Sequence, residues 1–393
     1  MEPKIRFKGF EGEWKAPLFS EMVERISASG QAGMLPGVEF EDIASGEGCF
    51  NKNIYQKECH KYGKLFYEGD ILFGKLRPYL KNIILADFNG VAIGDFWVLR
   101  SKGLDEKYLY TLVYSESFLK VANISSGSKM PRADWNLVST TKFVVPSAKD
   151  EQKAIGKYFT SLDSQISAAT SRLASLKQMK AASLQAMFPQ EGETVPKIRF
   201  KGFEGEWTWL KLGDISEQVK RKAPINSTAP VMMISALNGF INQSEKYSDN
   251  NAGSSLANYT LLKKGELSYN HGYSKTRNFG SCFNLLVEEA RIPFVYHSFR
   301  LTNDNDSFYA YYLNSGTKDK DLKRLVSSTA RMDGLLNISF KNYMELSVPH
   351  PSLAEQQAIA NYFTSLDRQI SLQSQRLEKL KQIKSACLDK MFV

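Results

Sequence analysis

Pro3-Lys4-Ile5-Arg6-Phe7-Lys8-Gly9-Phe10-Glu11-Gly12-Glu13-Trp14 stands at the start of the chain and recurs unchanged from Pro196 to Trp207. A second segment repeats as well, because EQKAIGKYFTSLDSQIS at 151–167 returns as EQQAIANYFTSLDRQIS at 355–371. Twelve identical residues in a row do not arise by chance. The chain is therefore a tandem duplication with a unit of roughly 190–205 residues.

The stretches between these repeats, 15–145 and 208–348, share only an outline. Each contains a Gly-acidic-apolar segment and ends in a strand-like run before a proline, Pro146 or Pro349. A duplicated frame with two diverged inserts predicts one scaffold that presents two recognition domains. We place them at 1–145 and 191–349, with a central helix at 146–190 and a C-terminal helix at 350–393.

The second repeated segment predicts two long helices. Its apolar residues are spaced alternately four and three apart, which is the heptad period of paired helices. Ser147-x-x-Asp150 and Ser352-x-x-Glu355 predict the helix starts, and each helix spans about 57 Å at about 38 residues. The predicted pairing seam is Ile155, Phe159, Leu162, Ile166, Leu173 and Leu176 in the first helix and Ile359, Phe363, Leu366, Ile370, Leu377 and Leu380 in the second.

A narrow seam of this period buries best against a second helix with the same seam, although each helix could instead lie on its own domain. Antiparallel pairing closes the duplicated chain into a circular pseudo-two-fold, with the inserts at opposite ends. Gln373 interrupts the second seam and either sets the register or faces a helix of another protein. The expected fold class is mixed α+β, with two recognition domains separated by two long antiparallel helices that form a coiled coil.

Composition favours a polyanionic partner. The chain of 393 residues has a net charge of +9 and a pI near 9.1, and cation-rich proteins bind phosphate polymers by counterion release. The four cysteines form no C-x-x-C pair, so neither a zinc site nor a disulfide framework is predicted. No secretory signal or membrane span is evident, and the cytoplasm is the expected location.

The order of these features resembles that of the specificity subunits of type I restriction-modification systems. The features that carry the resemblance are the P-x(4 to 5)-EQ-x-x-I-x-x-(Y/F)F helix starts at Pro146 and Pro349, the F-x-G-F-E-G-E-W blocks, and the stretch from Gly69 to Pro78. The resemblance covers essentially the whole chain. It implies that each recognition domain reads one half of an asymmetric, bipartite double-stranded DNA target.

The same resemblance implies the partners. Two methyltransferase subunits dock on the long helices and carry S-adenosylmethionine, and restriction subunits that hydrolyse ATP join them. This chain itself would bind no cofactor or metal and would have no catalytic residues. The alternatives are a stand-alone sequence-specific DNA-binding regulator and a coiled-coil scaffold for proteins.

Motifs of an enzyme are absent from the sequence. No Asn-Pro-Pro-(Phe/Tyr) or Asp-Pro-Pro-Tyr motif occurs, and the four histidines lack metal-ligand spacing. Gly69-x-x-x-x-Gly74-Lys75 imitates a phosphate-binding loop but continues with Leu76 instead of Ser or Thr. Its interior is expected to be a buried strand.

Side chains that read DNA are expected among basic, hydroxyl and aromatic residues outside the apolar runs. Ser125–Lys129 and Ser327–Arg331 occupy similar places in the two copies, which favours Lys129 and Arg331. Any one of these side chains could equally lie in a solvated charged loop. The candidates are Lys75, Arg77, Lys81, Ser128, Lys129 and Arg132 in the first insert, and Lys220, Arg221, Lys222, Tyr273, Lys275, Arg277 and Arg331 in the second.

Overall fold

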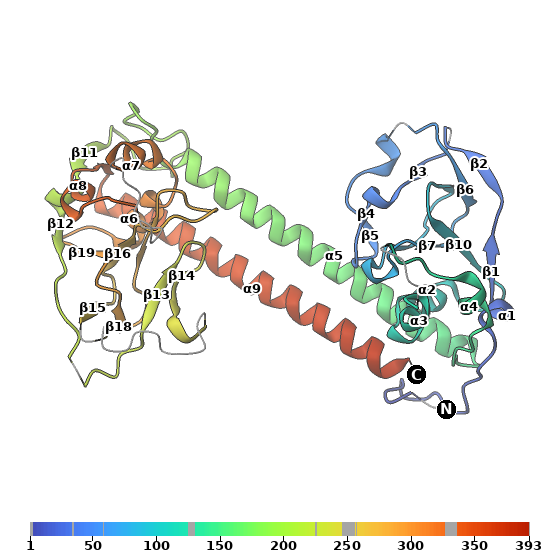
Figure 1. Cartoon of the computed structure of the whole chain (residues 1–393). Helices are drawn as coiled ribbons and strands as arrows, with labels where there is room; N and C mark the ends of the chain where they lie inside the picture. The colour runs from blue at the N-terminus through green and yellow to red at the C-terminus, as the bar shows by residue number, and fades with distance from the viewer. Residues whose placement is uncertain are drawn as a thin grey trace. The chain divides into compact units, whose positions relative to one another are not determined.

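The structure is a computed structural model that describes residues 3–33, 35–57, 59–124, 130–224, 226–245, 256, 258–326 and 336–392. It divides into two compact units, Met1–Leu173 with Leu372–Val393, and Ala174–Ser371. Two long helices, α5 (Lys149–Ala186) and α9 (Leu353–Met391), each contribute to both units (Figure 1). We call residues 15–145 head 1 and residues 208–349 head 2.

Head 1 is built on an antiparallel sheet of four strands in the order β1-β10-β7-β8. A second sheet has the order β2-β6-β9-β3, and three helices follow β10 in the chain. The bounds are α1 (Phe19–Met22), β1 (Val23–Ile26), β2 (Ser29–Gln31), β3 (Gly37–Val38), β4 (Ile43–Ala44), β5 (Cys49–Phe50), β6 (Tyr62–Phe66), β7 (Ile71–Gly74), β8 (Ile83–Leu85), β9 (Gly90–Ala92), β10 (Phe96–Ser101), α2 (Glu106–Tyr114), α3 (Glu116–Ala122) and α4 (Trp135–Thr140).

Head 2 repeats this plan. Its four-stranded sheet has the order β12-β19-β16-β17, and the hairpins β13-β14 and β15-β18 and the pair β11-β20 complete it. The bounds are β11 (Thr208–Lys211), β12 (Ser216–Gln218), β13 (Met232–Ser235), β14 (Gly239–Asn242), β15 (Thr260–Lys263), β16 (Leu267–Asn270), β17 (Ser281–Asn284), β18 (Glu289–Ile292), β19 (His297–Leu301), α6 (Asp306–Leu313), α7 (Asp319–Leu325), α8 (Phe340–Met344) and β20 (Ser347–His350).

Two strands show why the sheets form where they do. β7 is buried at all four positions, as expected for an apolar run between covered faces, and this confirms the buried strand predicted inside the Gly69–Gly74 segment. β10 pairs with it so that Trp97 lies opposite Phe73. In head 2 the same register places His297 opposite Tyr269.

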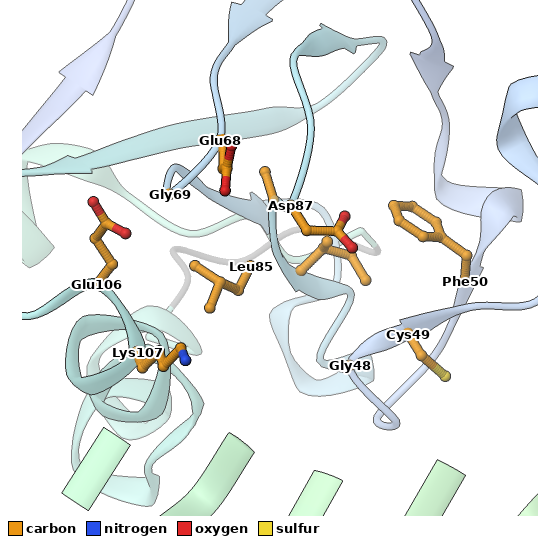
Figure 2. A pocket seen from close by; sticks show the side chains of 11 residues that line it. Gly48, Cys49, Phe50, Glu68, Gly69, Leu85, Asp87, Glu106 and Lys107 are labelled. Carbon is orange, nitrogen blue, oxygen red and sulfur yellow. The ribbon is translucent and has the colours of Figure 1, made fainter. Parts of the chain in front are cut away.

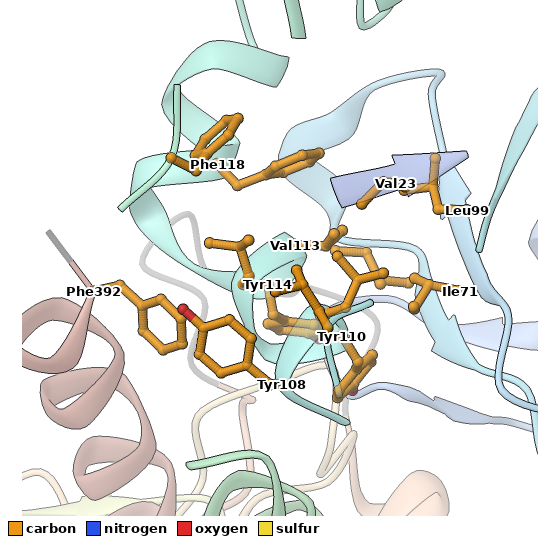
Figure 3. Close-up of a cluster of buried hydrophobic side chains, with 14 of the residues drawn as sticks. Val23, Ile71, Leu99, Tyr108, Tyr110, Val113, Tyr114, Phe118 and Phe392 are labelled. Carbon is orange, nitrogen blue, oxygen red and sulfur yellow. The ribbon is translucent and has the colours of Figure 1, made fainter. Parts of the chain in front are cut away.

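The long helices start inside the cores of their heads. Ile155, Phe159 and Leu162 of α5 belong to the main core of the first unit, together with the end of α9. Phe392 lies against Tyr108, with ring centroids 5.7 Å apart (Figure 3). It also lies against Phe159, with ring centroids 6.1 Å apart. In the second unit Phe188, just after α5, stacks on Phe363 of α9 at 5.9 Å.

The helices run antiparallel within each unit. In the first unit Tyr158 contacts Cys387, and Lys384 lies 2.5 Å from Asp163. In the second unit the matching contacts are Ser183 with Tyr362 and Lys180 with Asp367, the latter at 2.6 Å. Gln373 donates to the backbone oxygen of Ala169 at 3.1 Å, so this polar seam residue bonds across the helix pair.

Each repeated block of twelve residues holds the beginning of one long helix to the end of the other. Arg6 binds both carboxylate oxygens of Glu151 on α5 at 2.7 and 2.8 Å, and the Ile5 amide donates to the Lys390 oxygen on α9. Arg199 binds Glu355 at 2.6 and 2.7 Å, and the Ile198 amide donates to the Ala186 oxygen.

The glycines of these blocks are required by their backbone conformation. Gly9 and Gly12 have φ of 94° and 90°, and Gly202 and Gly205 have φ of 98° and 80°. Only glycine adopts such values readily. These turns bring the Gly12 and Gly205 carbonyls to the arginines that hold the helices.

The predicted cap of the first long helix is wrong, although the helix starts close to the predicted place. α5 begins at Lys149, and the Ser147 hydroxyl donates to the Glu13 oxygen in the repeat block instead of capping the helix. Ser352 does accept from the Glu355 amide at 3.3 Å. The Glu355 side chain, however, is bound by Arg199 and Trp207, so the expected reciprocal capping box is only half formed.

Candidate nucleic-acid interface

Both heads present the same pair of segments at the C-terminal end of the third strand in their sheets. In head 1 the segment that follows β7 pairs with residues 131–133, because the Ala133 amide donates to the Lys75 oxygen. In head 2 the Leu336 amide donates to the oxygen of His271, which follows β16. The sheets therefore place two segments side by side at corresponding edges. The predicted DNA-reading residues that lie there are Lys75, Arg77 and Arg132 in head 1 and Tyr273, Lys275 and Arg277 in head 2.

Three predicted residues of head 1, Lys75, Arg77 and Arg132, lie in these two paired segments. The Arg77 amide donates to the Pro131 oxygen at 2.7 Å, which sets Arg77 beside Arg132. Lys75 and Arg132 both bind the Asp95 carboxylate, at 3.2 and 3.1 Å. Burial raises the pKa of Asp95, but the hydrogen bonds from these two cations outweigh it and leave the pKa below its ordinary value.

The turn that follows is strained. Arg77 and Lys81 flank a short 3-10 helix, Pro78–Leu80, and have φ of 50° and 53°, in the left-handed region. Each such residue costs on the order of 1 kcal/mol or more. The turn leaves Tyr79 55% exposed. Lys81 lies apart from the Asp95 group, with its ammonium 5.9 Å from the ring centre of Tyr114.

Sequence reasoning missed two further cations of head 1. Lys64 on β6 donates from Nζ to the Phe96 oxygen at 2.8 Å. Burial lowers its pKa, and the charges of Lys75 and Arg25 lower it further. The Arg25 guanidinium on β1 lies 4.8 Å from the ring centre of Trp135. No short motif identifies these two residues, because only strand pairing brings them to the predicted group.

The candidates of head 2 are divided between the two ends of β16. Arg221 binds Glu266 at 2.6 Å, just before the strand. Beside it Lys220 is exposed, and Lys222 donates to the Asn258 side chain at 3.3 Å. Residues 273–277 follow the opposite end of the strand.

In that second group Tyr273 and Lys275 are exposed, with Tyr273 at 61%. The Arg277 guanidinium instead donates to the Asn314 oxygen at the end of α6, and burial lowers its pKa. His271 is buried and stacks on His297 with ring centres 4.9 Å apart. Its ring nitrogens lie 2.6 Å from the Leu336 oxygen and 3.0 Å from the Val295 oxygen.

Three predicted residues, Ser128, Lys129 and Arg331, lie outside the described residues. Their role in DNA contact stays a prediction.

The predicted helix seam is mostly buried. All twelve of its residues are described, and the first four of α5, Ile155 to Ile166, are each at most 6% exposed. Leu173, Ile370, Leu377 and Leu380 are half-buried. The buried remainder are Leu176, Ile359, Phe363 and Leu366.

A pocket of about 340 Å³ in head 1 is unsuited to DNA. Glu68, Asp87 and Glu106 line it against a single lysine, Lys107 (Figure 2). This excess of carboxylates repels phosphate. Within the described ranges, no cluster of His, Cys, Asp and Glu has the geometry to hold a metal ion, and no helix there is long and apolar enough to cross a membrane.

Comparison with known proteins agrees with this architecture. Residues 204–382 match the family model of the type I restriction modification DNA specificity domain. The specificity subunit of the type I restriction enzyme EcoDI from Escherichia coli is 25% identical over 120 residues, which cover 29% of this chain and 27% of that protein. The chain thus matches about a quarter of the length of this curated relative.

The fold is shared with a solved structure over its full length. The crystal structure of a type I restriction-modification S subunit from M. genitalium covers 100% of this chain and 99% of its own, with a TM-score of 0.62 and 17% identity. Over residues 204–382 the chain is therefore similar to the type I restriction modification DNA specificity domain, and over its full length it has the fold of an S subunit of such a system.

Proposed function

We propose that the chain is the DNA-specificity subunit of a type I restriction-modification complex, in which each head reads one half of an asymmetric bipartite target. The observation that carries this proposal is that two sheets of the same strand order present different polar side chains at corresponding loop edges. A common scaffold with different reading residues is what a target with two unlike halves requires.

The frame would set the distance between the halves and hold the partners. Both repeated blocks tie helix ends together by the same arginine–glutamate contact, which supports two equivalent docking surfaces. Two methyltransferase subunits would occupy them and supply S-adenosylmethionine, and restriction subunits that use ATP would join. In this proposal the chain itself is not an enzyme and binds no cofactor.

Co-expression with the cognate methyltransferase subunit, followed by genome-wide mapping of methylated adenines, tests the proposal. The expected result is one gapped motif with two unlike halves. A continuous palindrome, or no motif, would overturn it. Tight sequence-specific binding by the chain alone would indicate a stand-alone regulator, and absence of salt-dependent DNA binding would indicate a protein scaffold.

A further inference from the structure

Head 1 contains a group of cations that its own carboxylates do not neutralise. Arg25, Lys64, Lys75 and Arg132 come from four separate segments: Lys75 and Arg132 bind Asp95, and Lys64 lies within electrostatic range of Arg25, Lys75 and Asp95. Across the part of the chain that the structure describes, no carboxylate lies within ion-pair distance of Arg25 or Lys64. We call these four cations and Asp95 the basic cluster.

Lys64 is the most informative member, because it is half-buried and its ammonium donates to a carbonyl oxygen, that of Phe96. A desolvated cation beside other cations is unfavourable, and a nearby anion relieves that cost. Asp95 lies close enough to favour the charged form of Lys64, but it is already engaged by two other residues. The positive charge of the four cations therefore exceeds the negative charge of Asp95, and one more anion could bind favourably at this site.

Arg25 is positioned without using its hydrogen-bond donors on a carboxylate. Its guanidinium lies over Trp135, and Trp135 in turn contacts Trp97 edge-to-face at 5.3 Å. Stacking on an aromatic face fixes the plane of a guanidinium and leaves its N–H groups at the edge available to an acceptor. Arg25 is exposed, so an anion in solvent can reach it.

We propose that the basic cluster binds one backbone phosphate of the DNA half-site that head 1 reads, an inference that rests on the proposed function. Cations that converge from several segments fit a compact anion. A base edge carries no net charge, so it would not offset the desolvation of Lys64. The contact would fix the position of head 1 on the duplex, while neighbouring loop residues such as Arg77 and Tyr79 remain free to meet bases.

Among the residues of head 2 that the structure describes, there is no equivalent cluster. Gln218 takes the place of Arg25, because Arg25 pairs with Leu99 and Gln218 pairs with Phe299 in matching registers. His271 takes the place of Lys75, because the two residues directly follow the equivalent strands β16 and β7. Thr260 takes the place of Lys64, because each stands five residues before the glycine, Gly265 or Gly69, that precedes this strand. The charged positions of head 1 are therefore glutamine, threonine and a buried histidine in head 2, so this phosphate contact belongs to one half-site only.

Salt-dependent binding of the full chain, assembled with its methyltransferase subunit, tests this inference. Lys64→Gln should weaken binding to the methylated motif and to unrelated duplex by the same factor, several-fold at physiological salt. The slope of log K against log salt should fall by about 0.9, the value for one phosphate contact, and the mapped motif should not change. Lys102→Gln is the matched control, because Lys102 follows the far end of β10, is exposed, and donates from its ammonium to the Ser20 oxygen.

Two outcomes would overturn the inference while leaving the proposed function intact. One is an unchanged salt slope in Lys64→Gln, and the other is an altered motif, which would make the cluster a base reader. Arg25→Gln serves as a second variant, with the melting temperature as a check on folding in both, and it should lower the slope in the same way. Wild-type binding with no preferred motif would overturn the proposed function and this inference together.

Discussion

Heads 1 and 2 share a backbone plan and differ in the chemistry placed on it. Phe73 pairs with Trp97 where Tyr269 pairs with His297, in the same register of the same strand order. At the strand ends, head 1 has the basic cluster and a strained, exposed turn. Head 2 has instead two stacked histidines and Arg277, whose guanidinium donates to the backbone oxygen of Asn314. Buried sheet cores fix the scaffold, and the loop edges are then able to differ.

The repeat blocks show the opposite behaviour, because the same contacts occur in both units. One difference is informative: Trp207 Nε1 donates to Glu355 at 3.1 Å, whereas Trp14 Nε1 is buried without a hydrogen-bond partner among the residues that the structure describes. Among the described residues, the Glu355 side chain therefore binds both Arg199 and Trp207, whereas that of Glu151 binds Arg6.

The largest expected effect is that of Glu355→Ala. Glu355 is 1% exposed, and its removal leaves Arg199 without its carboxylate, which costs about 3–5 kcal/mol for a buried pair. Glu151→Ala should cost about 1 kcal/mol less, because no indole hydrogen bond is lost. Hydrogen exchange of peptides in each unit measures the two local stabilities separately. Equal losses in both variants, or losses no larger than in the exposed Glu206→Gln, would contradict this ranking.

A smaller effect is expected at the ion pairs between the long helices. The Lys384–Asp163 side chains are 11% and 15% exposed, and those of Lys180–Asp367 are 29% and 39% exposed. Lys384→Met should destabilise the first unit by about 1.5–3 kcal/mol. Lys180→Met should cost the second unit about 0–1 kcal/mol, as for exposed pairs.

The pH dependence of the stability of Lys384→Met tests whether the two ion pairs differ in burial. Burial raises the pKa of Asp163 above its ordinary value, and loss of the lysine should raise it further. A raised folded-state pKa means that the folded protein holds the proton more tightly, so stability is regained as pH falls toward that pKa. We expect partial recovery as the pH falls from neutral toward the ordinary carboxyl pKa of about 4, measured by hydrogen exchange. Lys180→Met should show no such recovery, and recovery in both variants would count against the difference in burial.

The smallest expected effect concerns the histidine that stands in place of Trp97. Burial lowers the pKa of His297, and the neighbouring His271 lowers it further. The unfolded chain then binds the proton more readily, so stability of head 2 is present at neutral pH and is lost as pH falls below about 6.5. Exchange of residues 336–345 should rise under acid while that of residues 132–141 in head 1 changes less. Equal acid sensitivity of both peptides would exclude this role of His297.

The sequence alone predicted the frame well, because identical residues and a heptad period carry it. Ile155, Phe159 and Leu162 needed only their spacing to be placed in a helix seam, although packing against head 1 could not be foreseen. The residues of the candidate interface were harder to predict from the sequence. Arg25 and Lys64 stand 39 positions apart and meet only through strand pairing, and no local pattern shows that Arg277 bonds Asn314. Register and loop closure, which depend on long-range contacts, decide such positions.

A chain with two copies of one head tests the central claim most directly. Replacing residues 15–145 by a second copy of residues 208–349 keeps both repeat blocks and both helices, and the chimera is co-expressed with the methyltransferase subunit for mapping of methylated adenines. If two independent readers sit on a pseudo-two-fold frame, the motif should become a gapped palindrome whose two halves equal one half of the wild-type motif. A folded, active chimera that still yields an asymmetric motif, or a palindrome unrelated to either wild-type half, would contradict the account.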